Sequence, residues 1–463
     1  MNYTDSVFLP FFLVTFTVYY LMPTVGLQLA VLVAASLFFY AWESPLLLLV
    51  FMLAWFITSV TSYFVLTSSS QRAKFYATIG VMANLSLLGF FKYKFLFIHP
   101  AHHAIASSLG EWLILAPLPI GISFYTFHGI SLLVDSFRGT YVRNSELQIR
   151  SHLGETLLYL VFFPQLIAGP IIKARDFFPQ VERKSIWDID FAGCARILIL
   201  GLFLKMVIAD NLSEQTFWIA YPFFQWKSKL DLMVMIYGYS AQIFADFAGY
   251  SLIAIGLAKL LGYRLPQNFN FPYFSTSISD FWRRWHISLS SWLRDYLYIP
   301  LGGNRKGEVR TYVNLILVML LGGLWHGAAW SFAIWGLWHG IGLALERKWL
   351  ASAFMTSDHR VSLMIRQFVV FNFVTIGWVF FKLQDFSDAT LYLERMVHND
   401  VTGISKKIDM MILIYAAAVF IYHVASVYRD RITQQFKDVI YGVMLFFVIT
   451  SAGPSTPFIY FQF

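Results

Sequence analysis

Apolar runs recur from one end of this sequence to the other, and no soluble domain lies between them. The candidate membrane spans lie near 6–22, 27–42, 45–66, 75–91, 112–134, 157–172, 192–208, 232–245, 247–261, 312–328, 329–345, 363–381, 410–427 and 439–452. A full helical crossing needs about 20 residues, so the shorter runs must be re-entrant, tilted or broken. Pro117, Pro164 and the pair Gly322-Gly323 interrupt three of the runs. We therefore expect about 11 to 13 true spans.

The amino-acid composition also indicates a protein that spans a membrane. The 463 residues are 58% hydrophobic and 13% charged, whereas soluble domains are about 25% charged. A soluble protein this apolar would expose large apolar patches and aggregate. The sequence therefore predicts an all-α polytopic membrane protein, with residues 1–463 forming a single integral membrane domain. The single cysteine, Cys194, excludes an intrachain disulfide and a multi-thiolate metal site.

Charge and the N-terminus indicate an orientation. The net charge of +8 fits cationic loops at the negative side of a membrane, or an anionic donor. Residues 1–6 lack the basic segment of a cleavable signal peptide, so the run from Val7 is expected to be a retained first span. The third loop, from Thr67 to Lys74, also carries Arg72. It is therefore expected to be cytoplasmic, which places the N-terminus outside.

The longest polar interval is 262–311. Ser277 and Asp280 have the spacing of a capping box, which predicts that a helix begins there. At helical spacing one face would carry Trp282, Trp285, Leu289, Trp292 and Tyr296. The opposite face is mainly polar, and Asp280 can pair with Arg284 four residues on. Two interpretations remain open: an interfacial amphipathic helix, or a basic helix that lines the mouth of a reaction chamber.

Chemistry is expected at ionisable residues within the apolar runs, because the usual nucleotide-binding, zinc-protease and serine-hydrolase motifs are missing. His326 and His339 share the local sequence Leu-Trp-His-Gly and stand thirteen residues apart. On one straight helix their offset would be about 220°, so they would not share a face. They are therefore expected to lie on two segments joined near Gly327 to Ala329, or to play different roles. His286 is a further candidate, whereas His128 is expected to pack or hydrogen-bond.

Asp246 stands between two apolar runs. It is interpreted as a cap at a helix break or as the partner of a nearby arginine.

The residues around these histidines resemble the membrane-bound O-acyltransferase family, and within it the bacterial alginate O-acetyltransferase branch. The supporting blocks are Pro119–Tyr125, Phe163–Pro170, Gln242–Gly256, Asn268–Tyr273, Asp280–Ser290, Trp292–Tyr298, Leu301–Gly307 and Gly322–Gly327, with looser agreement at Ile376–Lys382. The resemblance implies a helical fold around a central chamber. It implies that His326 is the catalytic histidine and that His286 is a second histidine of the same motif.

The resemblance also implies the substrates. The donor would be a cytoplasmic acetyl thioester, acetyl-coenzyme A, which is consumed as a co-substrate rather than held as a cofactor. The acetyl group would pass to periplasmic partner proteins that modify an exopolysaccharide such as alginate or cellulose. This places the chain in the bacterial inner membrane, with the polysaccharide synthesis machinery as a partner and no role for nucleic acid or metal.

One block departs from the alginate pattern. The sequence from Asp246 has Ala248 and Leu252 where the alginate branch has serine and aspartate, and in this it is similar to relatives that export D-alanine for teichoic acid. A D-alanyl transferase with a small acidic carrier protein as donor therefore stays open. A secondary transporter, which also uses broken helices and buried polar residues, is the third hypothesis.

The expected chemistry needs a base and a basic entrance. A hydroxyl acceptor ionises far above pH 7, so His326 is predicted to take its proton, although an acyl-histidine intermediate stays open. The phosphates of coenzyme A favour a cationic entrance. Its candidate residues are Arg283, Arg284, Arg294, Arg305 and Lys306. The alternative is that each is an ordinary anchor at the cytoplasmic surface.

Overall fold

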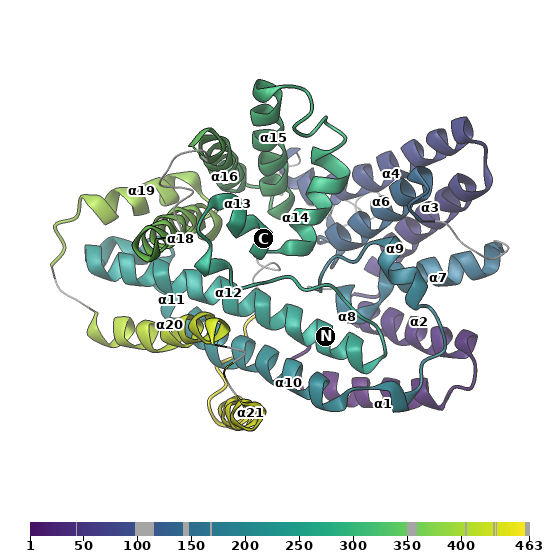
Figure 1. Cartoon of the computed structure of the whole chain (residues 1–463), viewed down its shortest axis with the longest axis horizontal. Helices are drawn as coiled ribbons and strands as arrows, with labels where there is room; N and C mark the ends of the chain where they lie inside the picture. Colours follow the sequence, from purple (N-terminus) through teal and green to yellow (C-terminus); the bar gives the residue numbers. More distant parts are fainter. Residues whose placement is uncertain are drawn as a thin grey trace. The chain divides into compact units, whose positions relative to one another are not determined.

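A computed structural model gives the fold. It describes residues 1–42, 44–97, 115–141, 148–166, 169–349, 359–402, 405–428, 431 and 433–458. These residues form helices joined by turns, and none of them lies in a β-strand (Figure 1). Two compact units are distinguished: one comprises 1–194 with 254–266, and the other comprises 195–253 with 267–463.

The first unit is built from an N-terminal set of apolar helices. They are α1 (Phe8–Leu21), α2 (Val25–Ala41), α3 (Leu47–Thr67), α4 (Ser70–Phe97), α6 (Ile122–Arg138), α7 (Ile149–Val161), α8 (Phe163–Leu166) and α9 (Ala174–Phe177). Helix α3 packs on both α4 and α6. Small residues allow this approach, because a Cβ at Gly129 of α6 would lie 2.9 Å from Thr58 Oγ1. His128 is buried against the ring of Tyr159, which agrees with the predicted packing role.

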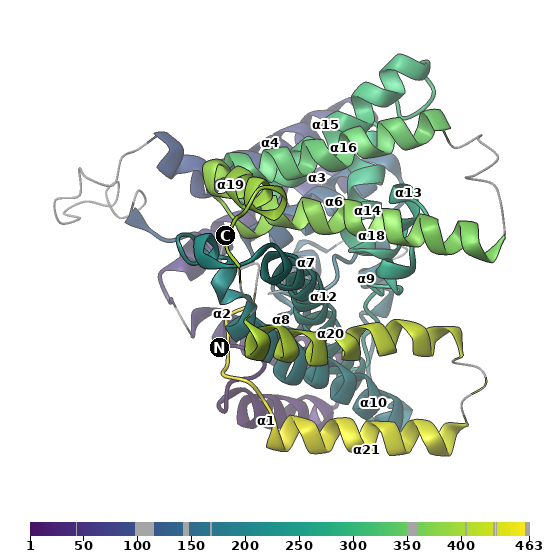
Figure 2. The same ribbon diagram turned by 90° about the vertical axis from the view of Figure 1, so that its left-hand side faces the viewer.

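The second unit contains the candidate catalytic residues. Its elements are most of α10 (Phe191–Leu202), the π-helical turn η4 (Phe203–Ala209), α11 (Asp210–Thr216), α12 (Lys229–Leu260) as far as residue 253, α13 (Ile278–Arg284), α14 (Ile287–Leu293), the π-helical turn η8 (Arg294–Tyr298), α15 (Glu308–His326), α16 (Trp330–Trp349), α18 (Arg360–Lys382), α19 (Phe386–Val397), α20 (Lys406–Val427) and α21 (Gln434–Thr450). Figure 2 shows α15 and α16 side by side along their length.

Seven helices in the described part of the chain are long and apolar enough to cross a membrane. They cover Leu47–Thr67, Ser70–Lys94, Phe191–Ile219, Lys229–Leu260, Glu308–His326, Arg360–Lys382 and Lys406–Val427. Helices α1 and α2 are apolar but shorter. The predicted all-α polytopic membrane fold is confirmed. The larger total of 11 to 13 spans stays a prediction.

Three expectations from the sequence need correction. The runs 232–245 and 247–261 belong to one continuous helix, α12. Asp246 does not end this helix, because a lysine neutralises its charge inside the protein. The helix that begins after Ser277 does not continue to Tyr296: α13 ends at Arg284 and α14 begins at Ile287. The five residues from Trp282 to Tyr296 therefore do not share one helix face. The amphipathic helix α19 was not predicted from the apolar runs.

Candidate functional site

His326 is the last residue of α15, and the chain turns sharply after it. Gly327 is extended, and α16 begins three residues later at Trp330. The prediction that His326 and His339 lie on two segments joined near Gly327 is confirmed. The two helices pack so closely that a side chain at Gly336 would overlap the carbonyl oxygen of Met319. Glycine is therefore needed at this crossing to place His326 against α16.

Aromatic side chains from three helices surround His326. Its ring centroid lies 4.9 Å from Trp325 of α15, 5.1 Å from Trp335 of α16 and 5.2 Å from Phe381 of α18. All three contacts are edge-to-face, and only 6% of the histidine is exposed. This aromatic cage holds the imidazole in place between α15, α16 and α18 and leaves little room for bulk water beside it.

His339 has a different environment, although its local sequence matches that of His326. The indole Nε1 of Trp282 donates a hydrogen bond to His339 Nδ1 at 3.3 Å, and the histidine is fully buried. Trp335 packs against both histidines, with ring centroids 5.1 Å apart in each case. Nδ1 therefore acts as an acceptor, which leaves the proton of neutral His339 on Nε2. We interpret His339 as a structural residue that holds α13 against α16.

His286 occupies the turn between α13 and α14. Its backbone is left-handed, with φ +43° and ψ +53°, a conformation that costs about 1–3 kcal/mol for a residue with a Cβ. The imidazole lies edge-on to Phe247 of α12 at 4.6 Å. Neither ring nitrogen has a hydrogen-bond partner among the described residues. Burial lowers the pKa of His286 to about 3, so the ring is neutral at physiological pH.

An asparagine that the sequence identified only as part of a family block holds this turn in place. Asn268 Oδ1 accepts hydrogen bonds from Ser288 Oγ at 2.6 Å and from the Ser288 backbone at 3.3 Å. Its Nδ2 donates to Ser251 Oγ of α12 at 3.0 Å. The Ile287 N–H also donates to the Asn268 carbonyl oxygen at 2.9 Å. Asn268 thus ties α12 to the start of α14 and fixes the unusual backbone of His286.

A row of tryptophans connects the two histidine-bearing segments. Trp285, the residue before His286, lies 5.0 Å from Trp378 of α18. Trp378 stacks on Trp335 at 5.7 Å, and Trp335 contacts His326. The structure therefore places His326 and the His286 turn at two ends of one buried aromatic cluster. The tryptophans are visible in the sequence, but their grouping is not, because the cluster brings together Trp285 and Trp378, which are more than ninety positions apart.

Three of the predicted basic residues are engaged by nearby carboxylates. Arg284 Nε lies 3.0 Å from Asp280, which confirms the predicted pair, and Arg283 lies 3.6 Å from the same carboxylate. The predicted cap is also present, because the Asp280 N–H donates to Ser277 Oγ at 2.9 Å. Arg294 pairs with Asp295 at 2.8 Å. Arg283 and Arg294 remain mostly exposed, so each can also reach an anion.

Arg305 and Lys306 lie in a tight turn between η8 and α15. The turn uses two glycines with positive φ, Gly302 at +109° and Gly303 at +55°. Asn314 of α15 donates a hydrogen bond to the Gly303 carbonyl oxygen at 2.9 Å, which anchors the turn to the helix. Both cations are exposed and form no ion pair within the described ranges. Of the five predicted donor-binding residues, these two have the least of their positive charge neutralised by nearby carboxylates.

The structure contains a buried ionic cluster that was not predicted from the sequence. Lys205, in the π-helical turn η4, lies 2.7 Å from Asp210 and 2.8 Å from Asp246, and its side chain is fully buried. Its Nζ also donates to the Thr456 carbonyl oxygen at 2.9 Å. Asp246 is therefore the partner of a lysine, rather than a helix cap or the partner of an arginine. The sequence feature that could have indicated this cluster is the presence of a lysine within the apolar run 192–208.

Comparison with known proteins identifies a matching family model and several relatives of this chain. Residues 37–383 match the model of the membrane-bound O-acyltransferase family. The chain is 38% identical to the probable alginate O-acetylase AlgI of Azotobacter vinelandii over 93% of this chain and 85% of that protein. It is 38% identical to a peptidoglycan O-acetyltransferase of Helicobacter pylori over 79% of this chain and 73% of that protein. It is 29% identical to a teichoic acid D-alanyltransferase of Bacillus subtilis over 62% of this chain and 71% of that protein.

Proposed function

Because the chain belongs to the membrane-bound O-acyltransferase family and is an acyltransferase, we propose that it is an O-acetyltransferase of a bacterial inner membrane. It takes the acetyl group from a cytoplasmic acetyl thioester, acetyl-coenzyme A. The group then crosses the membrane to a periplasmic partner that acetylates an exopolysaccharide. The similarity to both an alginate O-acetylase and a peptidoglycan O-acetyltransferase supports acetyl as the group and a cell-surface glycan as its destination.

The observation that carries this proposal is the aromatic cage around His326. The neutral imidazole removes the proton from the acceptor hydroxyl as the oxygen attacks the thioester carbonyl carbon. The carbon–sulfur bond then breaks, and the imidazolium returns the proton to the departing thiolate. The cage excludes water that would otherwise hydrolyse the thioester. General-base assistance of this kind contributes about 10²–10⁴-fold in rate.

His286 is proposed as the second histidine of the site. Its strained backbone is a reason to expect a function, since such conformations cluster at active sites. A neutral imidazole with no hydrogen-bond partner among the described residues has its donor and its acceptor available to a substrate. Its role is therefore hydrogen bonding to the acetyl donor or acceptor, whereas His326 transfers the proton.

The donor is proposed to bind through the five basic residues. Arg305 and Lys306 contribute most, because no carboxylate offsets their charge within the described ranges. Arg283, Arg284 and Arg294 keep their carboxylate partners and add to the positive potential near the phosphates. Changing Arg305 and Lys306 to glutamate should raise the KM for acetyl-coenzyme A and leave kcat within a few-fold. An unchanged KM would remove these two residues from the donor site.

The decisive experiment uses purified protein and labelled acetyl-coenzyme A. His326→Ala should lower acetyl transfer to a hydroxyl acceptor by about 10²–10⁴-fold while the protein still folds and inserts. His398→Ala is the matched control, because this histidine is exposed at the end of α19. Normal transfer by His326→Ala would refute the assignment, as would an equal loss in the control.

D-alanyl transfer remains the second candidate, and one block of sequence favours it. Ala248 and Leu252 replace the serine and aspartate expected in the alginate branch, and the similarity to a teichoic acid D-alanyltransferase extends over 302 residues. Offering the purified protein acetyl-coenzyme A and a D-alanyl carrier protein in parallel separates the two. Turnover of the carrier thioester alone would establish D-alanyl transfer. Family membership argues against the third hypothesis, a secondary transporter.

A further inference from the structure

The chain after α21 packs back onto the second unit. Residues 451–458 form an extended segment without helix or strand, and we call them the strap. Pro454 and Pro457 favour this extended backbone, because proline has no N–H to donate within a helix. The side chains of the strap are exposed or half-buried except that of Phe458, which is fully buried.

Hydrogen bonds fasten the first half of the strap to η4 and α11. The Gly453 N–H donates to the Met206 carbonyl oxygen at 2.8 Å. Asn211 Nδ2 donates to the Ser451 carbonyl oxygen at 3.1 Å. A Cβ at Gly453 would lie 2.7 Å from the Asn211 backbone nitrogen, so the strap lies directly against the backbone of α11.

The buried ionic cluster fastens the second half. Lys205 Nζ donates to the Thr456 carbonyl oxygen at 2.9 Å, and Thr456 Oγ1 donates to the Asp210 carboxylate. Hydrogen bonds that involve a charged group are about twice as strong as neutral ones. Two residues of chain span at most about 7 Å. The cluster therefore fixes where Phe458, two residues after Thr456, can pack.

Phe458 packs on the part of α12 that faces the His286 turn. Its ring centroid lies 4.6 Å from that of Tyr250 and 5.6 Å from that of Phe247. Phe247 is the residue whose ring meets the imidazole of His286 at 4.6 Å. One aromatic ring, that of Phe247, therefore contacts both the strap and His286.

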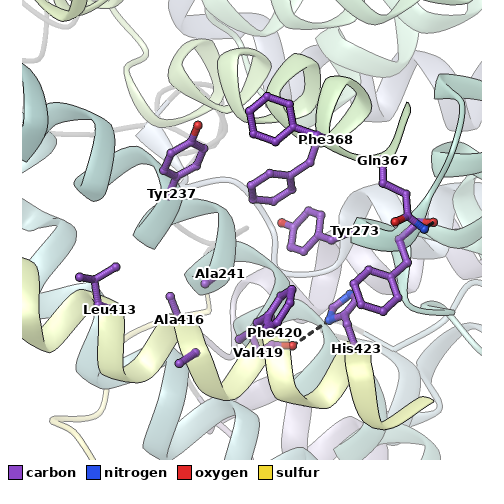
Figure 3. Close-up of a pocket in the computed structure, with 13 residues that line it drawn as sticks. Tyr237, Ala241, Tyr273, Gln367, Phe368, Leu413, Ala416, Val419, Phe420 and His423 are labelled. Carbon is purple, nitrogen blue, oxygen red and sulfur yellow. Dashed lines mark hydrogen bonds between the residues drawn. The ribbon is translucent and has the colours of Figure 1, made fainter. Parts of the chain in front are cut away.

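The orientation of the His286 ring depends on such packing. Neither of its nitrogens has a hydrogen-bond partner among the described residues, and a strained backbone persists only where its surroundings hold it. The aromatic cluster around the turn also borders empty space. Tyr273, whose ring lies 6.1 Å from that of Trp285, lines a cavity of about 460 Å³ (Figure 3). Because the cluster is not closely packed on every side, the contact at Phe247 is needed to keep the imidazole in place.

We propose that Phe458 is a positioning residue: the strap presses it against Phe247, and Phe247 holds the imidazole of His286 in the orientation that acetyl transfer uses. The effect on catalysis rests on the proposed function, in which His286 binds the acetyl donor or acceptor. The effect on the ring itself does not, so the two are measured separately.

The first measurement needs no acetyl transfer. Diethyl pyrocarbonate modifies neutral histidine rings, and peptide mass spectrometry of the purified full chain gives the rate of modification at each histidine. Phe458→Ala should raise the rate at His286 at least tenfold, because the cavity left by the missing ring gives Phe247 room to move. The buried histidines 326 and 339 should keep their wild-type rates, and the exposed His398 is the reference.

The matched control removes the same ring from an exposed position. Phe446→Ala on α21 should leave every rate at its wild-type value. If Phe458→Ala does not fold, Phe458→Val tests the same contact, with an increase of at least threefold expected at His286. An unchanged rate at His286 would overturn the proposal, as would an equal increase at histidines 326 and 339, which would indicate general loosening.

The second measurement is acetyl transfer. Phe458→Ala should lower kcat by about 10–100-fold, since a displacement of about 1 Å at a reacting centre can cost 10²-fold. The KM for acetyl-coenzyme A should stay within about twofold, because the basic residues proposed to bind the donor are unchanged. In the His286→Ala background the same substitution should cause no further loss, and a further tenfold loss would overturn the proposal. If modification of His286 increases while Phe458→Ala and His286→Ala both transfer acetyl normally, the proposed role of His286 is refuted but the positioning of its ring by the strap stands.

Discussion

Replacing Lys205 with methionine should severely destabilise the second unit. Methionine keeps much of the side-chain volume but removes the charge between Asp210 and Asp246. Each contact, at 2.7 and 2.8 Å, supplies about 6 kcal/mol of gross Coulomb attraction at an effective dielectric constant of about 20. Most of this attraction is offset by the cost of removing three charges from water. The variant, however, removes the lysine that pairs with both buried carboxylates, so we expect a net loss of about 3–5 kcal/mol in the free energy of unfolding.

The measurement is denaturant unfolding in a fixed detergent, compared with two further variants. Lys259→Met removes an ion pair of similar length, 2.8 Å to Asp190, but this pair is partly exposed. It should therefore cost no more than about 1 kcal/mol. The triple variant Lys205→Met, Asp210→Asn, Asp246→Asn leaves no buried charge at the cluster and should recover more than half of the loss. The reasoning is refuted if Lys205→Met and Lys259→Met lose the same amount, or if the triple variant is as unstable as Lys205→Met.

Three further predictions concern the surroundings of the histidines. Gly336→Ala should cost about 1–3 kcal/mol, because its Cβ overlaps the backbone of α15; Gly442→Ala, in open surroundings on α21, should be neutral or slightly stabilising in the same unfolding assay. Trp282→Phe removes the donor to His339 and should cost about 1–3 kcal/mol, measured against Trp187→Phe at an exposed position. The pKa of His286 is about 3 in the folded protein, but an unfolded histidine titrates near 6.5. The unfolded chain therefore binds the extra proton between these values, and stability falls by up to about 1.4 kcal/mol per pH unit below pH 6.5. His286→Asn should reduce the overall slope by this amount between pH 6.5 and pH 5, and an unchanged slope would contradict the buried, neutral assignment.

The helices themselves follow closely from local sequence. Long apolar runs such as Leu47–Thr67 and Arg360–Lys382 form helices because a membrane leaves the backbone no other way to satisfy its hydrogen bonds. Ser277 capped its helix as the spacing predicted, and Gly327 marked the turn after His326. These features depend on residues within four positions of one another. Local rules therefore suffice for them.

The misinterpreted segments are those in which a distant partner overrides the local pattern. Asp246 looked like a helix break, but Lys205, more than forty positions away, neutralises it inside a continuous helix. The stretch after Ser277 looked like one amphipathic helix as far as Tyr296. Asn268 and Ser251 instead fix a break at His286, because their hydrogen bonds replace those of a continuous helix. Periodicity contains no information about such partners.

The sequence by itself determined that this chain is a helical membrane protein, that it resembles the O-acyltransferases, and that His326 deserved first consideration as the base. Composition and short motifs are enough for those conclusions, because the bilayer permits few backbone structures and the family blocks are local. Only the tertiary structure decided that Trp335 packs between His326 and His339, that the histidines differ in environment, and that the His286 turn adjoins the same aromatic cluster. Those features arise from the packing of α13, α15, α16 and α18, and packing between separate helices is set by the whole chain rather than by any one segment.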